Sequence, residues 1–311
     1  MDIFIDWGST NFRAFLHDGT KVVARRTASD GGTLKNFAKA TPATRAREYS
    51  AFFMEQVGDW LEKHKASVYI CGAVGGREGW VETKYSEAPA SIADIRRNLH
   101  KIEPPPISGA LGYNVFIATG CCIALPDGRH DVMRSEEVKS HGAALHLNSS
   151  NALLCIPGTH NKWVEISDGK IVHFETALSG EIYGLMSERG ALAAVFAAAP
   201  EADTDFDSFD RGMDLADRGF DLLTDLWQVR AQKLRSDDPP AGLKAYFSGI
   251  LLGHELRQME KFFPAKPPVV LLADEGPKRL YYRQAFERYQ WKIRAEVDSE
   301  TAVCKGLGAL K

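Results

Sequence analysis

The chain contains one local pattern twice, and this repeat constrains the fold more than any other feature of the sequence. Residues 3–28 read as three β-prone runs separated by the turns WGSTN and DGTK. Residues 152–177 repeat the order with the turns PGTHN and SDGK, and such glycine-bearing turns between β-prone runs are hairpin signals. The first-turn glycines, Gly8 and Gly158, lie about half of the 311 residues apart, which indicates an internal duplication.

Alternating helices and strands are expected after each repeat. The spacing predicts helices over 44–64, 135–147 and 241–262, and strands at 68–72, 115–119, 269–273 and 293–297. The prolines at 104–106 predict a loop. Two α/β domains facing a common cleft are therefore expected, at 1–148 and 149–311, with the small polar residues 148–151 as a hinge.

Composition excludes several classes of protein. Hydrophobic residues make up 44% and charged residues 25%, as in ordinary globular proteins, and the net charge of -3 predicts no nucleic-acid partner. No apolar run has membrane-spanning length, and the first residues lack the features of a signal peptide, so no membrane association is expected. The odd number of cysteines, five, predicts reduced thiols and a cytoplasmic location.

The first turn of each repeat is a candidate phosphate site. Glycine permits close approach of the backbone to a phosphate, and hydroxyls and amides donate to its oxygens. Asp6, at the end of a buried strand, is suited to hold Mg²⁺ through water, since hard cations prefer carboxylate oxygen. The alternative is a pair of ordinary hairpin turns, which the equivalent positions in a duplicated unit disfavour. The candidates are Gly8, Ser9, Thr10 and Asn11 in the first turn, and Gly158, Thr159, His160, Asn161 and Lys162 in the second.

The paired turns resemble the phosphate motifs of the actin/hexokinase ATPase superfamily, and the whole chain resembles the 2-dehydro-3-deoxygalactonokinase family. The resemblance implies two duplicated ribonuclease H-like domains with an interdomain cleft. It also implies ATP and Mg²⁺ as cofactors, and transfer of a phosphoryl group to the 6-hydroxyl of 2-dehydro-3-deoxy-D-galactonate. The segments that carry the resemblance are IDWGSTNFRAFL at 5–16, GAVGGREGW at 72–80, VMRSEEVKSHGA at 132–143, IPGTHNKWVEI at 156–166, LSGE at 178–181 and FSGILLGHEL at 247–256.

The resemblance also implies catalytic residues. A carboxylate shortly before the second turn would take the proton of the sugar hydroxyl, and Glu136 is the first candidate and Glu137 the second. Asp6 completes the catalytic set. Ser135 stands where the family pattern has glycine, which affects the local backbone. The alternative for the two glutamates is a purely structural preference for a helix N-terminus.

An anionic substrate needs cationic partners, and Arg77 and Arg134 are the candidates for its carboxylate. Glu78 would bind sugar hydroxyls, and Trp80 would pack on the carbon face of the sugar. Each of these side chains could instead be a surface charge or a core aromatic. Gly276 follows the strand at 269–273 and is the candidate for contact with the nucleotide base, although it is displaced from the family pattern.

Two other functions remain open from the sequence. One is a phosphatase or polyphosphate hydrolase of the same superfamily, with water as acceptor. The other is a catalytically silent sensor of sugar acids. The sequence does not distinguish galactonate from gluconate derivatives, and a homodimer is compatible with it.

Overall fold

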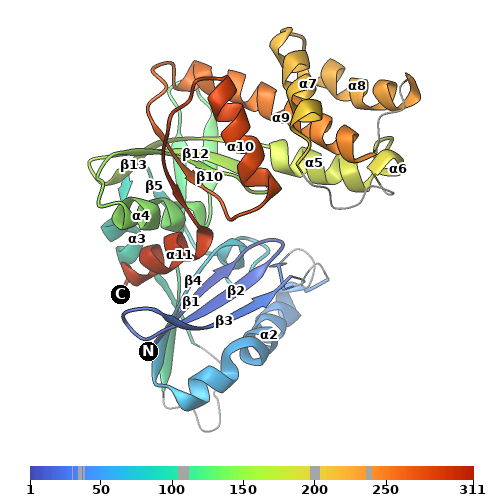
Figure 1. The fold of residues 1–311 in the computed structure, drawn as a ribbon. Helices are drawn as coiled ribbons and strands as arrows, with labels where there is room; N and C mark the ends of the chain where they lie inside the picture. The colour runs from blue at the N-terminus through green and yellow to red at the C-terminus, as the bar shows by residue number, and fades with distance from the viewer. Residues whose placement is uncertain (30, 34–36, 38, 104–111, 197–203, 236–239) are drawn as a thin grey trace. The chain divides into compact units, whose positions relative to one another are not determined.

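The first repeat forms one edge of a six-stranded sheet in the computed structural model (Figure 1). Strands β1 (Asp2–Trp7), β2 (Phe12–His17) and β3 (Val22–Ala28) form an antiparallel meander, as predicted. The remaining strands are β4 (Ala66–Cys71), β8 (Tyr113–Ile117) and β7 (His100–Ile102), which give the order β3-β2-β1-β4-β8-β7. β4 and β8 run parallel to β1, so their carboxyl ends share one edge of the sheet.

The second repeat builds a sheet of the same design. Its order is β15-β14-β11-β12-β13-β6, and β14 runs parallel to both β11 and β15. The order β13-β12-β11-β14-β15 therefore matches β3-β2-β1-β4-β8, which confirms the duplicated α/β fold class. The strands are β11 (Ala152–Ile156), β12 (Asn161–Ser167), β13 (Lys170–Ala177), β14 (Val269–Leu272), β15 (Ile293–Val297) and β6 (Ala90–Ser91).

The structure describes all residues except 30, 34–36, 38, 104–111, 197–203 and 236–239, so the predicted loop at 104–106 lies outside the described residues. Contacts divide the chain into two compact units. The first comprises Met1–Ala152, Val164–Phe174 and Ser299–Lys311, and the second comprises Leu153–Trp163 and Glu175–Asp298. The last segment thus belongs to the first unit, although the sequence placed every residue after 148 in the second domain. The predicted domain limits and the hinge stay predictions.

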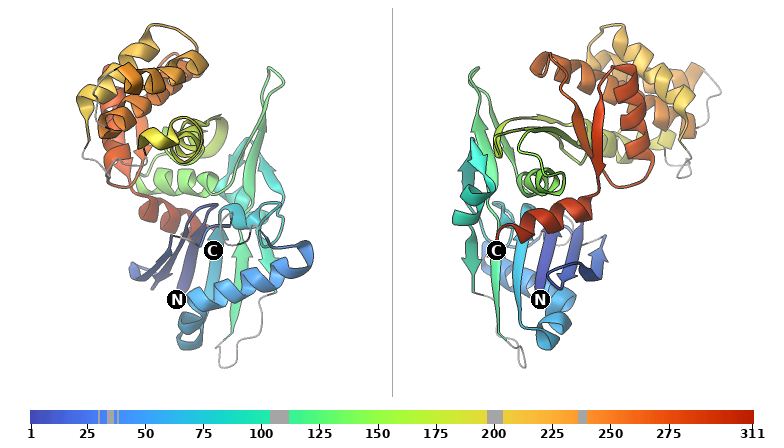
Figure 2. Two further views of the ribbon diagram at one scale, coloured as in Figure 1. Left: turned by 90° about the vertical axis from the view of Figure 1, so that its right-hand side faces the viewer. Right: turned by 60° about the vertical axis from the view of Figure 1, so that its left-hand side comes forward.

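Helices cover both faces of the first sheet (Figure 2). Helix α2 (Pro42–Lys63) begins with a capping box at Thr41 and buries Tyr49 and Phe53 against one face, where Ile5 and Trp7 of β1 point. The opposite face, with Phe4, packs against α4 and α11. The other elements of this unit are α3 (Ile92–Arg97), α4 (Glu136–His146), α11 (Ser299–Gly308), the 3₁₀ helix η1 (Ala73–Gly75) and a small sheet of β5 (Tyr85–Glu87), β9 (Gly120–Ala124) and β10 (His130–Met133).

Helix α4 lies against α11 at very short distance because glycines form the contact. A Cβ atom at Gly142 would lie 1.8 Å from the carbonyl oxygen of Ala302, and one at Gly306 would lie 2.2 Å from that of Val138. Any larger residue would push the two backbones apart. This contact fixes the position of α4, whose first turn carries Glu136 and Glu137.

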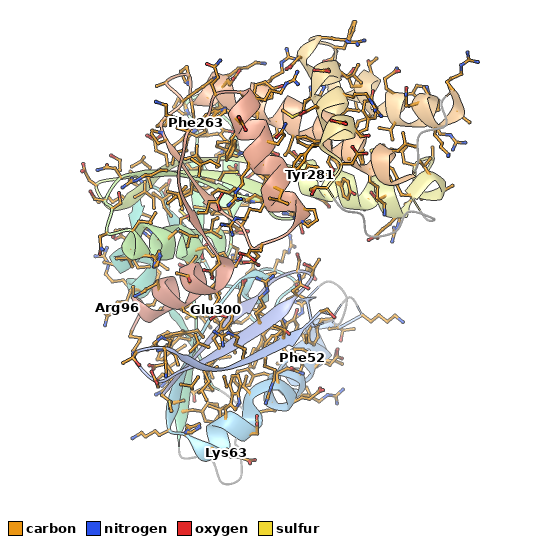
Figure 3. All side chains as sticks on the ribbon, in the orientation of Figure 1. Phe52, Lys63, Arg96, Phe263, Tyr281 and Glu300 are labelled. Atoms are coloured by element: carbon orange, nitrogen blue, oxygen red, sulfur yellow. The ribbon has the colours of Figure 1, made fainter. Side chains whose placement is uncertain are left out.

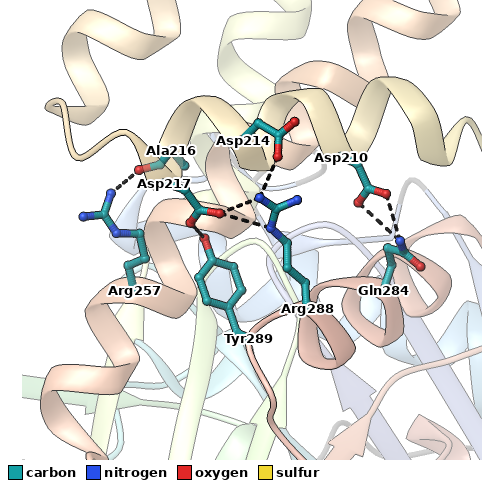
Figure 4. A network of polar contacts seen from close by, with 8 residues as sticks. All are labelled: Asp210, Asp214, Ala216, Asp217, Arg257, Gln284, Arg288 and Tyr289. Carbon is teal, nitrogen blue, oxygen red and sulfur yellow. Dashed lines mark hydrogen bonds and ion pairs between the residues drawn. The ribbon is translucent and has the colours of Figure 1, made fainter.

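Helix α9 forms the centre of the second unit, and α7 packs on it through Gly212 and Gly249. Tyr281 of α10 (Figure 3) stacks on Phe209 of α7 with ring centroids 4.5 Å apart. Arg288 joins the same helices by ion pairs of 2.6 Å with Asp214 and Asp217 (Figure 4). The helices are α5 (Ser179–Glu188), α6 (Ala193–Phe196), α7 (Phe206–Asp217), α8 (Leu222–Arg235), α9 (Pro240–Phe262) and α10 (Pro277–Arg288). Among the described residues, no helix is both long enough and apolar enough to cross a bilayer.

The glycine contact between α4 and α11 can be tested by adding one methyl group. Gly142→Ala should lower the free energy of unfolding by about 2–3 kcal/mol, because the Cβ overlaps the Ala302 carbonyl and the helices must separate. Gly184→Ala, in the interior of α5 with nothing within 4 Å of its Cβ, is the matched control and should stabilise by about 0.5–1 kcal/mol. Urea unfolding measures both, and equal stability of Gly142→Ala and wild type would contradict the close packing.

Candidate active site

The first candidate phosphate turn, residues 7–11, is a compact loop held by backbone contacts. The Gly8 amide donates to the Asn11 carbonyl at 3.0 Å, and the Thr33 amide donates to the Gly8 carbonyl at 3.1 Å. Gly32 lies directly behind the turn, where a Cβ atom would come within 2.2 Å of the Thr10 backbone. Ser9 and Thr10 remain partly exposed, so their groups are accessible to a ligand.

Asp6 ends β1 immediately before this turn and is only 8% exposed. Its Oδ1 accepts a hydrogen bond of 2.8 Å from the Ser135 hydroxyl, and its Oδ2 lies 2.9 Å from the Lys139 ammonium. Burial alone would raise the pKa of Asp6, but Lys139 and Ser135 together hold that pKa below its ordinary value. Asp6 is therefore an ionised carboxylate, and the same ion pair raises the pKa of Lys139 despite its burial.

A directly bound Mg²⁺ does not fit Asp6. Each carboxylate oxygen already has a protein partner, and the ammonium of Lys139 would repel a second cation on the same carboxylate. The described residues contain no group of three or more His, Cys, Asp or Glu side chains that could hold a metal ion. The predicted contact of Asp6 with Mg²⁺ through water stays a prediction.

The two candidate bases occupy different environments at the start of α4. Glu137 is fully buried, and its Oε2 accepts a hydrogen bond of 2.8 Å from the Ser135 amide. Burial, followed by the charge of Glu136, raises the pKa of Glu137 to about 8, so this carboxyl is mostly protonated at neutral pH. Glu136 is partly exposed and accepts a hydrogen bond of 3.1 Å from the Arg134 amide. Of the two, only Glu136 is accessible to solvent.

The two candidate arginines differ in how firmly they are held. Arg134 donates to the hydroxyl and the carbonyl of Thr83, and its guanidinium lies 4.3 Å from the ring centroid of Tyr85. Arg77 is exposed, and its side chain makes no hydrogen bond or ion pair with any residue that the structure describes. Arg77 is thus available to an anionic ligand, whereas Arg134 already has a structural role.

The other two candidates for the substrate have structural partners. Glu78 is exposed and forms an ion pair of 3.1 Å with Arg45. Trp80 is only 9% exposed and lies in the aromatic cluster of the first unit, 5.4 Å from Phe53 between ring centroids. The expectation that Trp80 packs on the sugar stays a prediction, and its burial favours the alternative of a core aromatic.

The second candidate phosphate turn, residues 157–161, is held by a buried carboxylate. Asn161 accepts from the Gly158 amide at 2.8 Å and donates to Glu255 of α9 at 2.7 Å. Glu255 also accepts hydrogen bonds from Trp163 at 3.0 Å, from Ser179 at 2.6 Å and from Tyr282 at 3.1 Å. Asn161 is therefore part of the support of the turn, and a role in phosphate contact stays a prediction.

The remaining side chains of the second turn are divided between surface and interior. Thr159 and His160 are exposed, and His160 Nε2 lies 2.8 Å from a carboxylate oxygen of Glu181. Lys162 is buried, and its ammonium donates to the Thr176 hydroxyl. Gly180 backs this turn, because a Cβ there would lie 2.0 Å from the Gly158 carbonyl oxygen.

Two features of the second unit bear on the nucleotide base. Gly276 has a φ of 140°, a value that L side chains rarely adopt, and stands directly before α10. A cavity of about 700 Å³ lies between α5, α9 and the loop before α8, and Ser179 and Glu255 of the turn network are among its lining residues. Gly276 is not part of that cavity lining, so the predicted base contact at Gly276 stays a prediction.

The sequence did not predict three features of the site. These are the roles of Lys139 and Glu255, and the hydrogen bond that the Ser135 hydroxyl donates to Asp6. Lys139 stands four residues after Ser135, a spacing that places both on one side of a helix. Glu255 lies in the segment FSGILLGHEL, which carried the family resemblance. Neither position identifies its partner without the tertiary structure.

Comparison with known proteins covers nearly the whole chain. A family model described as 2-keto-3-deoxy-galactonokinase matches residues 6–310. The chain is 30% identical to the 2-dehydro-3-deoxygalactonokinase of Escherichia coli K12 over 99% of its own length and 96% of the relative's. It is 33% identical to a protein of Rhizobium meliloti named as a probable 2-dehydro-3-deoxygalactonokinase, covering 98% and 94%. A crystal structure from Sinorhizobium meliloti, of a protein proposed to have the same activity, matches with a TM-score of 0.83 and 28% identity, covering 100% of this chain and 95% of that one.

The buried carboxyl of Glu137 should make stability depend on pH. Its pKa is about 8 in the folded chain and about 4.5 when exposed, so the stability present at pH 4.5 is lost progressively as the pH rises to 8. Glu137→Gln removes this titration. The free energy of unfolding of the variant minus that of wild type should therefore be larger at pH 8.5 than at pH 5, by up to about 4 kcal/mol. Urea unfolding at the two pH values measures the difference.

Glu62→Gln is the matched control, since Glu62 is exposed on α2. This control should follow the pH dependence of wild type. If Glu137→Gln and wild type show the same change of stability with pH, Glu137 is not a buried neutral carboxyl.

Proposed function

Because the chain belongs to the 2-keto-3-deoxy-galactonokinase family, we propose that it transfers the γ-phosphoryl group of ATP to the 6-hydroxyl of 2-dehydro-3-deoxy-D-galactonate. The observation that carries the proposal is the family match over residues 6–310, which includes both phosphate turns and the first turn of α4. The duplicated sheet order supports it, because each sheet places a glycine-bearing turn after its first strand.

Both turns would bind the phosphates of ATP. The Thr10 hydroxyl and the amides of the first turn, together with Thr159 and His160 of the second, are exposed or partly exposed donors. The backing glycines, Gly32 and Gly180, keep each turn in one conformation, so less ordering is needed on binding. Magnesium, when bound with ATP, would neutralise charge on the phosphates.

Glu136 would act as the general base. The oxygen of the 6-hydroxyl attacks the γ-phosphorus, the bond from this phosphorus to the bridging oxygen breaks, and ADP leaves. The proton of the hydroxyl passes to the Glu136 carboxylate. The partial exposure of Glu136 supports this role, and the raised pKa of Glu137 disfavours the alternative, because a protonated carboxyl cannot accept the proton.

Arg77 would bind the carboxylate of the sugar acid. Its guanidinium has the geometry for two parallel hydrogen bonds to a carboxylate and is not engaged by another described residue. Glu78 follows it in the same exposed loop and would accept hydrogen bonds from sugar hydroxyls. Arg134 would contribute positive charge from its fixed position beside Tyr85.

We also propose that the enzyme works in the cytoplasm. Among the residues that the structure describes, the five cysteines form no disulfide, and Cys71 and Cys155 are buried in the cores, as expected for a reducing compartment. ATP as a substrate agrees with that location.

A coupled assay of ADP release tests the function. With ATP and Mg²⁺, ADP should form only when the keto-deoxy acid is added, and mass spectrometry should find one phosphate on the acid. Release of ADP without any acid would indicate a hydrolase, and binding of the acid without turnover would indicate a sensor. A panel that includes the gluconate-derived epimer would define which acid is preferred.

Removing the proposed base should lower kcat far more than it changes KM for the acid. Glu136→Gln should lower kcat by about 100-fold or more, with little change in KM for the acid, because the amide cannot accept the proton. Steady-state kinetics measure both constants, with Glu62→Gln as the control that keeps wild-type values. Near-normal turnover of Glu136→Gln would move the role of base to another group.

Removing the free guanidinium should weaken binding of the acid. Arg77→Ala should raise KM for the acid about tenfold or more with a smaller effect on kcat, because a charge-assisted pair is lost. Arg96→Ala, an exposed arginine of α3 in the same unit, is the control and should leave KM unchanged. If Arg77→Ala also leaves KM unchanged, another group binds the carboxylate.

A further inference from the structure

Ser135 has a backbone conformation that is unusual for any residue with a side chain. Its φ is 101° and its ψ is -39°, it is only 3% exposed, and its side chain does not cap α4. Glycine adopts this region without a steric penalty, whereas serine does not. The residue with this strained backbone donates a hydrogen bond of 2.8 Å from its hydroxyl to Asp6 Oδ1. Strained backbone conformations of this kind are often found at functional sites.

Lys139 holds the other oxygen of the same carboxylate. Its ammonium lies 2.9 Å from Asp6 Oδ2, and both side chains are largely buried. The Lys139 amide donates to the Ser135 carbonyl at 3.0 Å, so one helical turn rigidly joins the two partners of Asp6. The first turn of α4 thus contacts both oxygens of Asp6, where β1 leads into the first candidate phosphate turn, and the Cys71 thiol of β4 adds a weaker contact of 3.9 Å to Oδ1.

We propose that Ser135 and Lys139 are positioning residues that hold Asp6 fixed, and that the Lys139 ammonium excludes a divalent cation from direct coordination by this carboxylate. The inference rests on the proposed function for its link to catalysis. Its physical basis is that two cations compete for one buried carboxylate whose oxygens are both already paired. Asp6 would then contact a metal only through water.

A purely structural ion pair is the alternative, and divalent-cation binding separates the two. Mn²⁺ is the probe, and electron paramagnetic resonance counts the free ion, with and without a non-hydrolysable ATP analogue. Lys139→Gln should bind Mn²⁺ about tenfold more tightly than wild type, because the competing charge is gone. The double variant Asp6→Asn/Lys139→Gln should lose this gain.

Lys311→Gln is the matched control, since it removes another lysine–aspartate pair of the first unit, Lys311 with Asp2 at 2.7 Å. It should bind Mn²⁺ as wild type does. The inference is overturned if Lys139→Gln binds Mn²⁺ no more tightly than wild type, or if the double variant Asp6→Asn/Lys139→Gln keeps the gain. Neither result depends on kinase activity, so failure of the proposed function would be recognised separately.

Ser135→Gly gives a second test that does not require Lys139→Gln to fold. Glycine relieves the backbone, so Tm should rise, whereas kcat should fall about tenfold because Asp6 loses a hydrogen bond. Ser135→Ala should lower kcat without raising Tm. Gln290→Gly, at another residue with positive φ (59°) after α10, should raise Tm and leave kcat unchanged. A higher Tm with full kcat in Ser135→Gly would show that the hydroxyl has no positioning role.

Discussion

The contact between α4 and α11 fixes the geometry on which the candidate site depends. Gly142 and Gly306 allow the two helix backbones to touch, which sets the height and rotation of α4 against the first sheet. The first turn of α4 then presents Ser135 and Lys139 to Asp6, and Glu136 to solvent. A shift of one ångström in α4 would therefore change the contacts of Asp6 and the base together. The contact of α11 with α4 also explains why the last segment of the chain, Ser299–Lys311, belongs to the first unit.

The two candidate phosphate turns have equivalent places in duplicated sheets but different supports. In the first, the backbone of Gly32 fills the space behind the turn, and Asp6 is neutralised by Lys139. In the second, the buried carboxylate of Glu255 gathers four side-chain donors and keeps Asn161 in place. Buried polar and charged groups need hydrogen-bond partners. The start of α4 supplies those of Asp6, whereas β12, α5 and α10 supply those of Glu255.

The sequence predicted what local patterns determine. The hairpins, the long helix α9 and the duplicated order are confirmed, because turn residues and periodicity are properties of neighbouring positions. Contacts between distant segments were not predictable: Lys139 with Asp6, Glu255 with Asn161, and the small sheet of β5, β9 and β10. The burial of Trp80 shows the same limit, since the resemblance implied contact with the sugar whereas tertiary packing places this ring among core aromatics.

The central proposal is that the first turn of α4 and each of the two strand turns bind the reactants. Hydrogen–deuterium exchange with mass spectrometry tests it most directly, comparing the free chain with the chain saturated by a non-hydrolysable ATP analogue and the keto-deoxy acid. The account predicts added protection in peptides covering residues 6–13, 134–139 and 157–162, and little change elsewhere in the two cores. Unchanged exchange in these three segments, with protection appearing at other places, would contradict it.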